Sequence, residues 1–482
     1  MRQVIRGILI VLIPALLIGM GAGLLLLARQ NQTLQAQLDE SRQHSVDLQA
    51  QVDQDKAQIA RFQAQIDELK NQVDALTKQL QDTGLKPIPA ISPKNAATMD
   101  TIEKDVQNIR GLTATRTVTR TLLTKDELRQ HVVDMQEKNY TQSDAHRDAL
   151  ALAALDLLKP DFKLYDFIVD LYSEQIAGFY EPDTKQLYVI AEPGDLSVLE
   201  KITFAHEFDH ALQDQHFDLA KLGFTNDKTR KIKDADRQIA YQALVEGDAT
   251  LLMQQWGQQK LSALDLLGAT SGTPPTPVLD SAPHVFREQL LFPYLSGLSF
   301  VTSLYAQGGW QAVDAAFDHP PDSSEQILHP ERYPDDQPMP VNLPPLTNTL
   351  PSGWHAVDEN TLGEFMLRQY LTEHLTRTQE IDQAAGGWGG DRYAVYASGN
   401  DQQRVLAIES IWDSSHDADE FAAAYRDYAT ARFGGPPAHP DNNGEWWMGT
   451  DVLFFGQSGD RTLIVVGPDE VTVRAVMNLI QH

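Results

Sequence analysis

Cysteine is absent from the 482 residues of the chain. The protein therefore has no disulfide bonds, and no thiolate is available to bind a metal ion. Positive charge is also scarce, because 39 lysines and arginines stand against 67 aspartates and glutamates, a formal net charge of −28. A negative field of this size repels nucleic acids and anionic lipid surfaces, so we expect neither as a partner. Any metal site must be built from histidines and carboxylates.

A long uncharged run occurs near the N-terminus, at residues 7–28. Its 22 residues are enough to cross a bilayer as a helix at about 1.5 Å per residue. A secretory signal peptide would have a shorter apolar region, of roughly 7–15 residues, and a cleavage site of small residues, which LLLLARQ does not supply. Arg2 and Arg6 precede the run, so we expect residues 1–6 in the cytoplasm and the bulk of the chain outside it. We predict a single-pass membrane anchor that is not cleaved.

A seven-residue repeat follows at residues 34–80, within a predicted coiled coil of residues 30–83. Eleven of its fourteen core positions are apolar. β-branched residues dominate one core series and leucines the other, which favours a parallel dimer. We therefore expect a homodimer. A proline-rich linker, residues 84–98, ends the coiled coil.

Hydrophobic periodicity predicts an α+β fold for the rest of the chain, in two domains at residues 99–345 and 346–482. For the first domain we expect a β-hairpin around residues 181–184 and helices at 125–135, 143–158, 165–173 and 234–256. For the smaller second domain we expect strands at 393–396, 405–412, 447–455 and 462–466, with helices at 418–432 and 470–480. The second domain is rich in tryptophan. Two interpretations stay open: a plain accessory domain, or a domain that recognises substrate or envelope ligands through exposed tryptophans.

The stretch TFAHEFDHALQDQHFDL, residues 203–219, contains the pattern H-E-x-x-H. On a helix, His206 and His210 lie one turn apart on the same face and can bind one ion together. The alternative is a solvated polar helix face. Phe204 and Phe208 argue against it, because they require this helix to be buried, where unpaired histidine and glutamate are costly. The residues therefore predict a Zn²⁺ site, with Glu207 directed toward a metal-bound water.

His216 is one candidate for a third ligand. It stands six residues after His210, as in the metzincin pattern, but Gln213 replaces the glycine that breaks the helix there. A continuing helix would carry His216 out of reach of the metal.

Glu246 is the stronger candidate for the third ligand. It lies in the middle of an apolar helix face, where a carboxylate needs a cation or a hydrogen-bonding partner. Gly247 lacks a side chain, so we expect this helix to approach the histidine helix closely at that point. Asp248 is a candidate for orienting one of the histidines.

HEFDH, followed 36 residues later by Glu246, resembles the gluzincin class of zinc metallopeptidases. The resemblance covers roughly residues 165–260 and implies a zincin-like fold for residues 99–345. It implies zinc ligation by His206, His210 and Glu246. It also implies that Glu207 is the general base and that the hairpin before the histidine helix is a substrate-binding edge strand. Thr250 is a departure, since many gluzincins have an aspartate there. The phrases EGDA, SSEQILHPERY and GGWGGDRY resemble a poorly characterised group of bacterial membrane-anchored proteins.

The expected function is hydrolysis of peptide bonds by a membrane-anchored zinc metallopeptidase. Two imidazoles and one carboxylate leave an open position for water, and Glu207 would take its proton. His329 and Tyr305 are candidates for stabilising the oxyanion, against the alternative that each is a packing or capping residue. The rival function is a non-enzymatic coiled-coil envelope scaffold with a structural or degenerate zinc site. Glu207 favours the enzyme, because a structural site needs no base.

Overall fold

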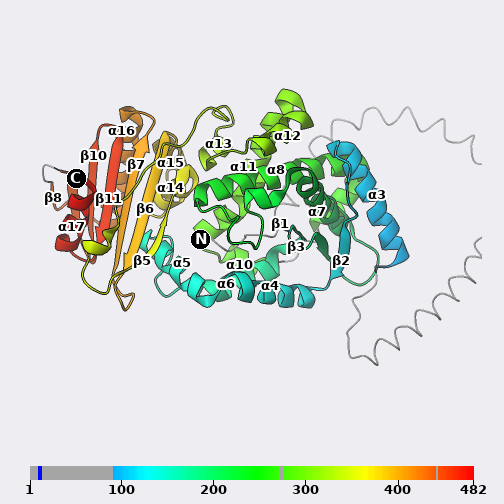
Figure 1. The fold of residues 1–482 in the computed structure, drawn as a ribbon, viewed down its shortest axis with the longest axis horizontal. Coiled ribbons are helices and arrows are strands. Elements are labelled where there is room, and N and C mark those ends of the chain that lie inside the picture. The colour runs from blue at the N-terminus through cyan, green and yellow to red at the C-terminus, as the bar shows by residue number, and fades with distance from the viewer. Residues whose placement is uncertain (1–8, 13–90, 272–274, 441–442, 482) are drawn as a thin grey trace, which may run out of the picture.

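A computed structural model describes residues 9–12, 91–271, 275–440 and 443–481 (Figure 1). The predicted coiled coil and most of the predicted membrane anchor lie outside these residues, so the anchor and the dimer stay predictions. Within the described ranges, no helix is both long and apolar enough to cross a membrane.

The fold is α+β, as predicted, and has a helical region followed by a large antiparallel sheet. In Figure 1 the sheet stands at one end of the molecule and the helical region occupies the middle and the other end. The helical region consists of α3 (Pro93–Arg110), β2 (Thr119–Leu123), α4 (Lys125–Asn139), α5 (Gln142–Ala154), α6 (Leu164–Gln175), β3 (Ile176–Glu181), β4 (Gln186–Ile190), α7 (Val198–Phe217), η3 (Leu219–Leu222), α8 (Ala235–Lys260), α9 (Ala263–Ser271), α10 (Pro277–Asp280), α11 (His284–Gly308), α12 (Trp310–Asp318) and α13 (Ser324–Leu328).

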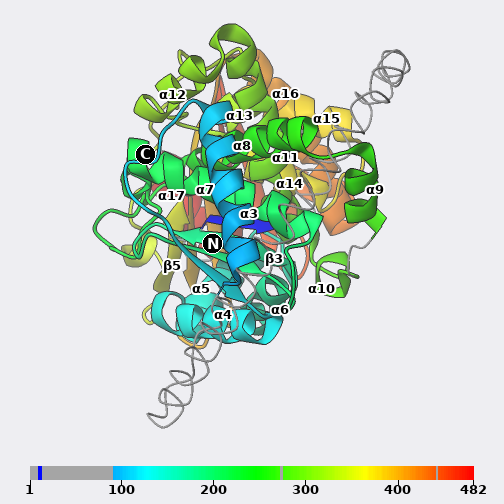
Figure 2. The same ribbon diagram turned by 90° about the vertical axis from the view of Figure 1, so that its right-hand side faces the viewer.

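Helix α3 begins inside the segment predicted as linker. The hydroxyl of Ser92 caps the helix by accepting a hydrogen bond from the backbone N–H of Asn95, and Pro93 occupies the first turn, where its missing N–H costs nothing. The folded part therefore starts before the predicted Met99. Figure 2 shows α3 lying across the helical region, where it contacts α7 and α8.

Helix α7 carries the H-E-x-x-H pattern and is delimited by local signals. Ser197 and Glu200 form a capping box at its N-terminus, so two backbone N–H groups find partners. Asp218 ends the helix in the left-handed conformation, with φ of 57°. Residues 202–214 between these ends are all buried. The helix is thus a central element of the core, as its apolar residues predict.

Helix α8 packs most closely on α11. A Cβ atom at Gly247 would overlap the backbone carbonyl of Gly297, and one at Gly297 would overlap that of Ala243. The two glycines therefore let the backbones of α8 and α11 touch. The prediction that Gly247 serves the approach to the histidine helix was wrong, because its neighbour is α11.

A small sheet in the order β1-β3-β4-β2 lies beside α7. The hairpin β3–β4 matches the predicted one, and its β3 strand contacts α7 at Gly178, where a Cβ would meet the side chains of Thr203 and Glu207. The outer strand β1 (Leu9–Leu12) pairs antiparallel with β3. At these four residues the structure differs from the predicted membrane helix. Without β1, one side of β3 would leave its backbone N–H and C=O groups unpaired, and an extended segment satisfies them.

The C-terminal region is a seven-stranded sheet in the order β5-β6-β7-β11-β10-β9-β8. Side chains alternate between its faces, so Trp447 and Phe455 pack under α16 while Trp446 and Phe454 pack under α17. Its elements are β5 (His355–Asn360), α14 (Gly363–Thr372), α15 (Thr378–Ala385), β6 (Trp388–Ala397), β7 (Arg404–Trp412), α16 (Ser415–Phe433), β8 (His439–Pro440), β9 (Glu445–Met448), β10 (Val452–Ser458), β11 (Arg461–Gly467) and α17 (Glu470–Gln481).

One expectation for this region needs correction, and one open alternative is decided. The single strand predicted at 447–455 is two strands, β9 and β10, because residues 449–451 turn the chain back on itself. Four of the five tryptophans are fully buried, namely Trp388, Trp412, Trp446 and Trp447. These rings form the core of the sheet and are not a ligand-binding surface.

Candidate metal site

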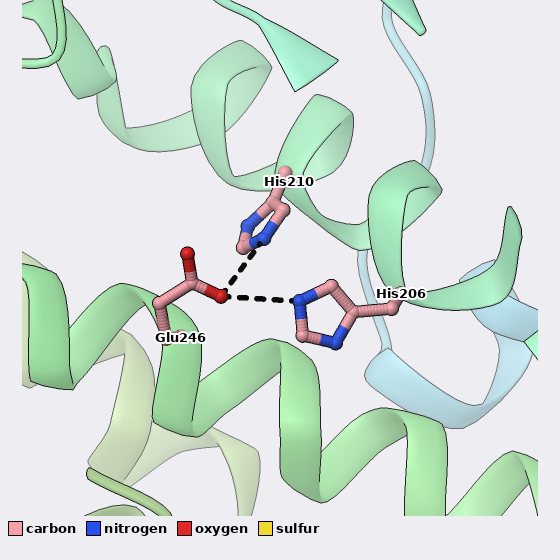
Figure 3. Close-up of side chains that lie close together, drawn as sticks. All are labelled: His206, His210 and Glu246. Atoms are coloured by element: carbon pink, nitrogen blue, oxygen red, sulfur yellow. Dashed lines mark hydrogen bonds and ion pairs between the residues drawn. The ribbon is translucent and has the colours of Figure 1, made fainter. Parts of the chain in front are cut away.

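The structure brings His206, His210 and Glu246 together, as predicted (Figure 3). Both imidazoles project from α7 toward α8, and their Nε2 atoms lie 3.1 and 3.4 Å from the same oxygen, Oε2 of Glu246. One ligand atom from each of the three residues lies within 4.8 Å of the others. Three donors this close, two of them imidazole nitrogen atoms and one a carboxylate, form the donor set of a zinc site.

Burial determines the charge of this cluster. His206 and His210 are 0% exposed and Glu246 is 1% exposed. Burial lowers the pKa of His206 to about 4, so this ring is neutral at pH 7. Its Nε2–H donates to Oε2 of Glu246 at 3.1 Å, and a metal ion would take the place of this proton. Burial alone would raise the pKa of Glu246, but the two histidines outweigh that effect and lower it.

The site therefore holds a carboxylate in the core, between two imidazoles. The Nε2 atom of His210 also makes no hydrogen bond. A buried anion and an unbonded buried nitrogen are both costly. A divalent cation would satisfy both, so the residues fit the predicted Zn²⁺.

Glu207 lies between the two histidines in sequence and is also fully buried. Its side chain packs against β3, where Gly178 leaves room for it. Its charge raises the pKa of Tyr294, which is hydrogen-bonded to Glu246, so Glu207 lies beside the same cluster.

Tyr294 of α11 belongs to the same cluster and was missed by the sequence analysis. It is hydrogen-bonded to Glu246, and its ring centroid lies 6.3 Å from that of His206. Burial, followed by the charges of Glu246 and Glu207, raises the pKa of Tyr294 well above its usual value. The phenol therefore stays protonated and is a hydrogen-bond donor inside the site.

Three other predicted candidates lie elsewhere. Helix α7 continues past His210, as expected, and the Nε2–H of His216 donates to the carbonyl of Thr113 at 2.8 Å. His329 follows the end of α13, where its Nε2 lies 3.1 Å from Glu364 and its Nδ1 lies 3.8 Å from Glu331. Tyr305 packs edge-on against Trp310. The structure thus gives His329 and Tyr305 packing and ion-pair contacts away from the histidine cluster, in agreement with the alternative to an oxyanion role.

A second acidic cluster contains Glu325, Asp336 and Asp413. Arg332 stands among the three, forms an ion pair with Glu325, and lies 3.2 and 3.6 Å from Asp413 and Asp336. The guanidinium already supplies the positive charge, so this cluster is an ion-pair network.

Comparison with known proteins bears on the C-terminal sheet only. Residues 349–477 match a family described as a domain of unknown function, DUF8575. No curated protein matched the sequence, and no solved structure matched it. The helical region with the histidine cluster lies outside the matched residues, so the case for its function rests on its own geometry.

Proposed function

We propose that the protein is a zinc-dependent peptidase of the gluzincin type, with His206, His210 and Glu246 as metal ligands. The observation that supports this most strongly is the burial of a carboxylate between two imidazoles. A zincin-like fold of the helical region is part of the same proposal. The hairpin β3–β4, packed against α7 at Glu207, supports it.

Each polar group of the site has a role in this proposal. A bound zinc ion supplies a Lewis acid and a water of lowered pKa. Glu207 accepts the proton of the attacking water and passes it to the leaving amine. Tyr294 keeps its proton and donates to Glu246 in the metal-free site, and in the proposed reaction it would turn this O–H to the negative charge that develops on the substrate carbonyl oxygen.

A neighbouring cavity favours substrates with an apolar side chain close to the scissile bond. It has a volume of about 100 Å³ and lies between α5, α6, α8, α11 and α14. Gln242 and Leu290 line it, one helical turn before Glu246 and Tyr294 respectively. Most of its lining is aliphatic or aromatic, which suits a leucine-sized or phenylalanine-sized group.

Access to the site requires movement. All three proposed ligands and Glu207 are at most 1% exposed. β1 is hydrogen-bonded to β3 and lies against α7, so it is one of the segments that must leave before an extended peptide can pair with β3.

The test combines metal analysis with a digest of a broad peptide library by the full-length protein. We expect about one zinc per chain and cleavage next to apolar residues. Glu207→Gln should keep the metal and lose cleavage by about 10²-fold or more, because it removes the base without removing a ligand. Glu200→Gln, in the same helix, is the matched control: glutamine preserves the capping box, so activity should stay at the wild-type level.

The same experiment tests the rival function. Full zinc occupancy without cleavage of any library peptide would favour the non-enzymatic scaffold. Equal activity of Glu207→Gln and the wild type would contradict the assigned base.

A further inference from the structure

A chain of buried polar side chains runs from His210 away from the metal site. The Nδ1 atom of His210 lies 2.9 Å from Oε1 of Gln213, and Nε2 of Gln213 lies 3.0 Å from Oδ2 of Asp248. Both oxygens of Asp248 accept hydrogen bonds from Arg110, at 2.9 and 3.0 Å. All four residues are at most 1% exposed. The chain links α7, α8 and the end of α3.

The partners of Gln213 determine which way its amide points. Its nitrogen faces two acceptors at 3.0 Å, the backbone carbonyl of Val245 and the carboxylate of Asp248. A flipped amide would place its oxygen against both of these oxygens, with no proton between them. The amide oxygen must therefore face His210.

This orientation selects one tautomer of His210. Because Oε1 of Gln213 can only accept, a proton sits on Nδ1, and Nε2 is the ring nitrogen left to bind a metal. Nε2 is the atom that faces Glu246 at 3.4 Å. The orientation of the ring is thus preorganised for metal binding through Nε2.

Arg110 anchors the other end of the chain. It is the last residue of α3, where the helix dipole favours a cation, and it neutralises Asp248. Its guanidinium also pairs with Asp314 at 2.7 Å and lies 4.4 Å from the ring centre of Trp310. Because the guanidinium is fixed by Asp314 and Trp310 and donates two hydrogen bonds to Asp248, it holds the Asp248 carboxylate in one position.

We propose that Gln213, Asp248 and Arg110 are positioning residues that hold His210 in the Nδ1–H tautomer with its Nε2 lone pair toward Glu246. They would thereby set the affinity of the site for a divalent metal ion. The inference rests on the proposed function, because it assigns these residues a role toward the zinc of the same site. It also connects α3, through Arg110, to the metal site.

The test measures Zn²⁺ affinity of the full-length protein by competition with a chelator. Gln213→Met keeps the side-chain length and removes the acceptor, so we expect affinity to fall by about 10–100-fold. Gln215→Met is the matched control: Gln215 lies in the same helix, but its amide oxygen accepts from the backbone N–H groups of Thr115 and Arg116. It should leave the affinity within about twofold of the wild type, since no bond of the chain to His210 is lost.

Arg110→Lys and Arg110→Met extend the test to the far end of the chain. Lysine keeps the positive charge but cannot form two hydrogen bonds to the carboxylate in one plane. The Zn²⁺ affinity of Arg110→Lys should therefore lie between that of the wild type and that of Arg110→Met. A merely structural role would lower thermal stability without this ranking in metal affinity.

A second measurement needs no metal and no activity. ¹⁵N NMR of ring-labelled histidine in the metal-free protein should show His210 as a single Nδ1–H tautomer in the wild type and as a mixture in Gln213→Met. Equal affinities and equal tautomer ratios in the two proteins would overturn the positioning role and leave the proposed peptidase standing. A wild type that binds no zinc at all would overturn both proposals.

Discussion

The helical region and the C-terminal sheet both have tightly buried cores, but they bury different chemistry. The sheet core is aromatic and aliphatic, and its largest side chains are Trp388, Trp412, Trp446 and Trp447. The layer between α7 and α8 instead buries ionisable and amide groups, namely His206, Glu207, Asp209, His210, Gln213, Glu246 and Asp248. Buried apolar groups stabilise a fold, whereas buried polar groups cost free energy unless they are paired. The buried side chains of the sheet therefore stabilise the fold, whereas the layer between α7 and α8 contains the candidate metal site.

The largest expected effect tests whether this layer is a metal site. Glu246→Ala should lower Zn²⁺ affinity by roughly 10³-fold or more, because two imidazoles alone do not make a stable tetrahedral site. His216→Ala should bind zinc like the wild type, since His216 is bonded to the backbone at Thr113. The zinc content of the two folded variants, measured under the same conditions, shows whether Glu246 or His216 is the third ligand. Loss of zinc in His216→Ala with retention in Glu246→Ala would replace the proposed ligand set.

The sequence predicted the parts of this layer that are local. A spacing of four residues places His206 and His210 on one helix face whatever the rest of the fold does, and a carboxylate on an apolar face marks Glu246. Tyr294 and Arg110 could not be found in this way. Tyr294 reaches the site only because Gly297, three residues later, meets Gly247 in the crossing of α8 and α11.

Non-local pairing also decides features of the fold that local patterns leave open. The predicted membrane anchor stays a prediction, but its residues 9–12 pair with β3 in the structure, and no local pattern specifies that partner. The tryptophans of the C-terminal sheet could be exposed or buried on composition alone. They are buried because two helices, α16 and α17, cover opposite faces of that sheet.

A pH titration should show opposite signs for two buried groups, His206 of the helical region and Asp391 of the sheet. Burial lowers the pKa of His206 to about 4, so in the metal-free protein the unfolded chain binds this proton more readily, and stability is lost as pH falls from 6.5 toward 4. Burial raises the pKa of Asp391, in β6, to about 6, so its contribution is lost in the opposite direction, as pH rises from 4 toward 6. Each effect amounts to about 3 kcal/mol.

Unfolding by denaturant across this pH range checks both signs. His206→Asn should weaken the loss of stability on acidification, and Asp391→Asn should weaken the loss on alkalinisation. A change of the same sign in both variants would contradict the assignment.

A substitution in the sheet core should change stability and leave the metal alone. Trp412 stacks on Phe421 and donates from Nε1 to Oγ1 of Thr462 at 3.0 Å. Trp412→Phe removes that hydrogen bond and leaves a small cavity, so we expect the free energy of unfolding to fall by ~1–3 kcal/mol. Zinc bound per folded molecule should be unchanged. A fall in zinc affinity with this variant would show that the two regions are coupled.

The smallest expected effect distinguishes two buried tyrosines of the helical region. Tyr294→Phe removes the hydroxyl that is hydrogen-bonded to Glu246, so kcat should fall by about 10-fold while zinc content stays constant. Tyr172 of α6 is almost as buried and lines the apolar cavity. Its pKa is raised by burial alone, without a contribution from Glu246 or Glu207. Tyr172→Phe should therefore lower stability by about 1 kcal/mol and keep kcat within about twofold. Steady-state kinetics on one cleaved library peptide compares the two variants. A loss of kcat in Tyr172→Phe equal to that in Tyr294→Phe would assign both effects to packing, and the oxyanion donor would have to be sought elsewhere.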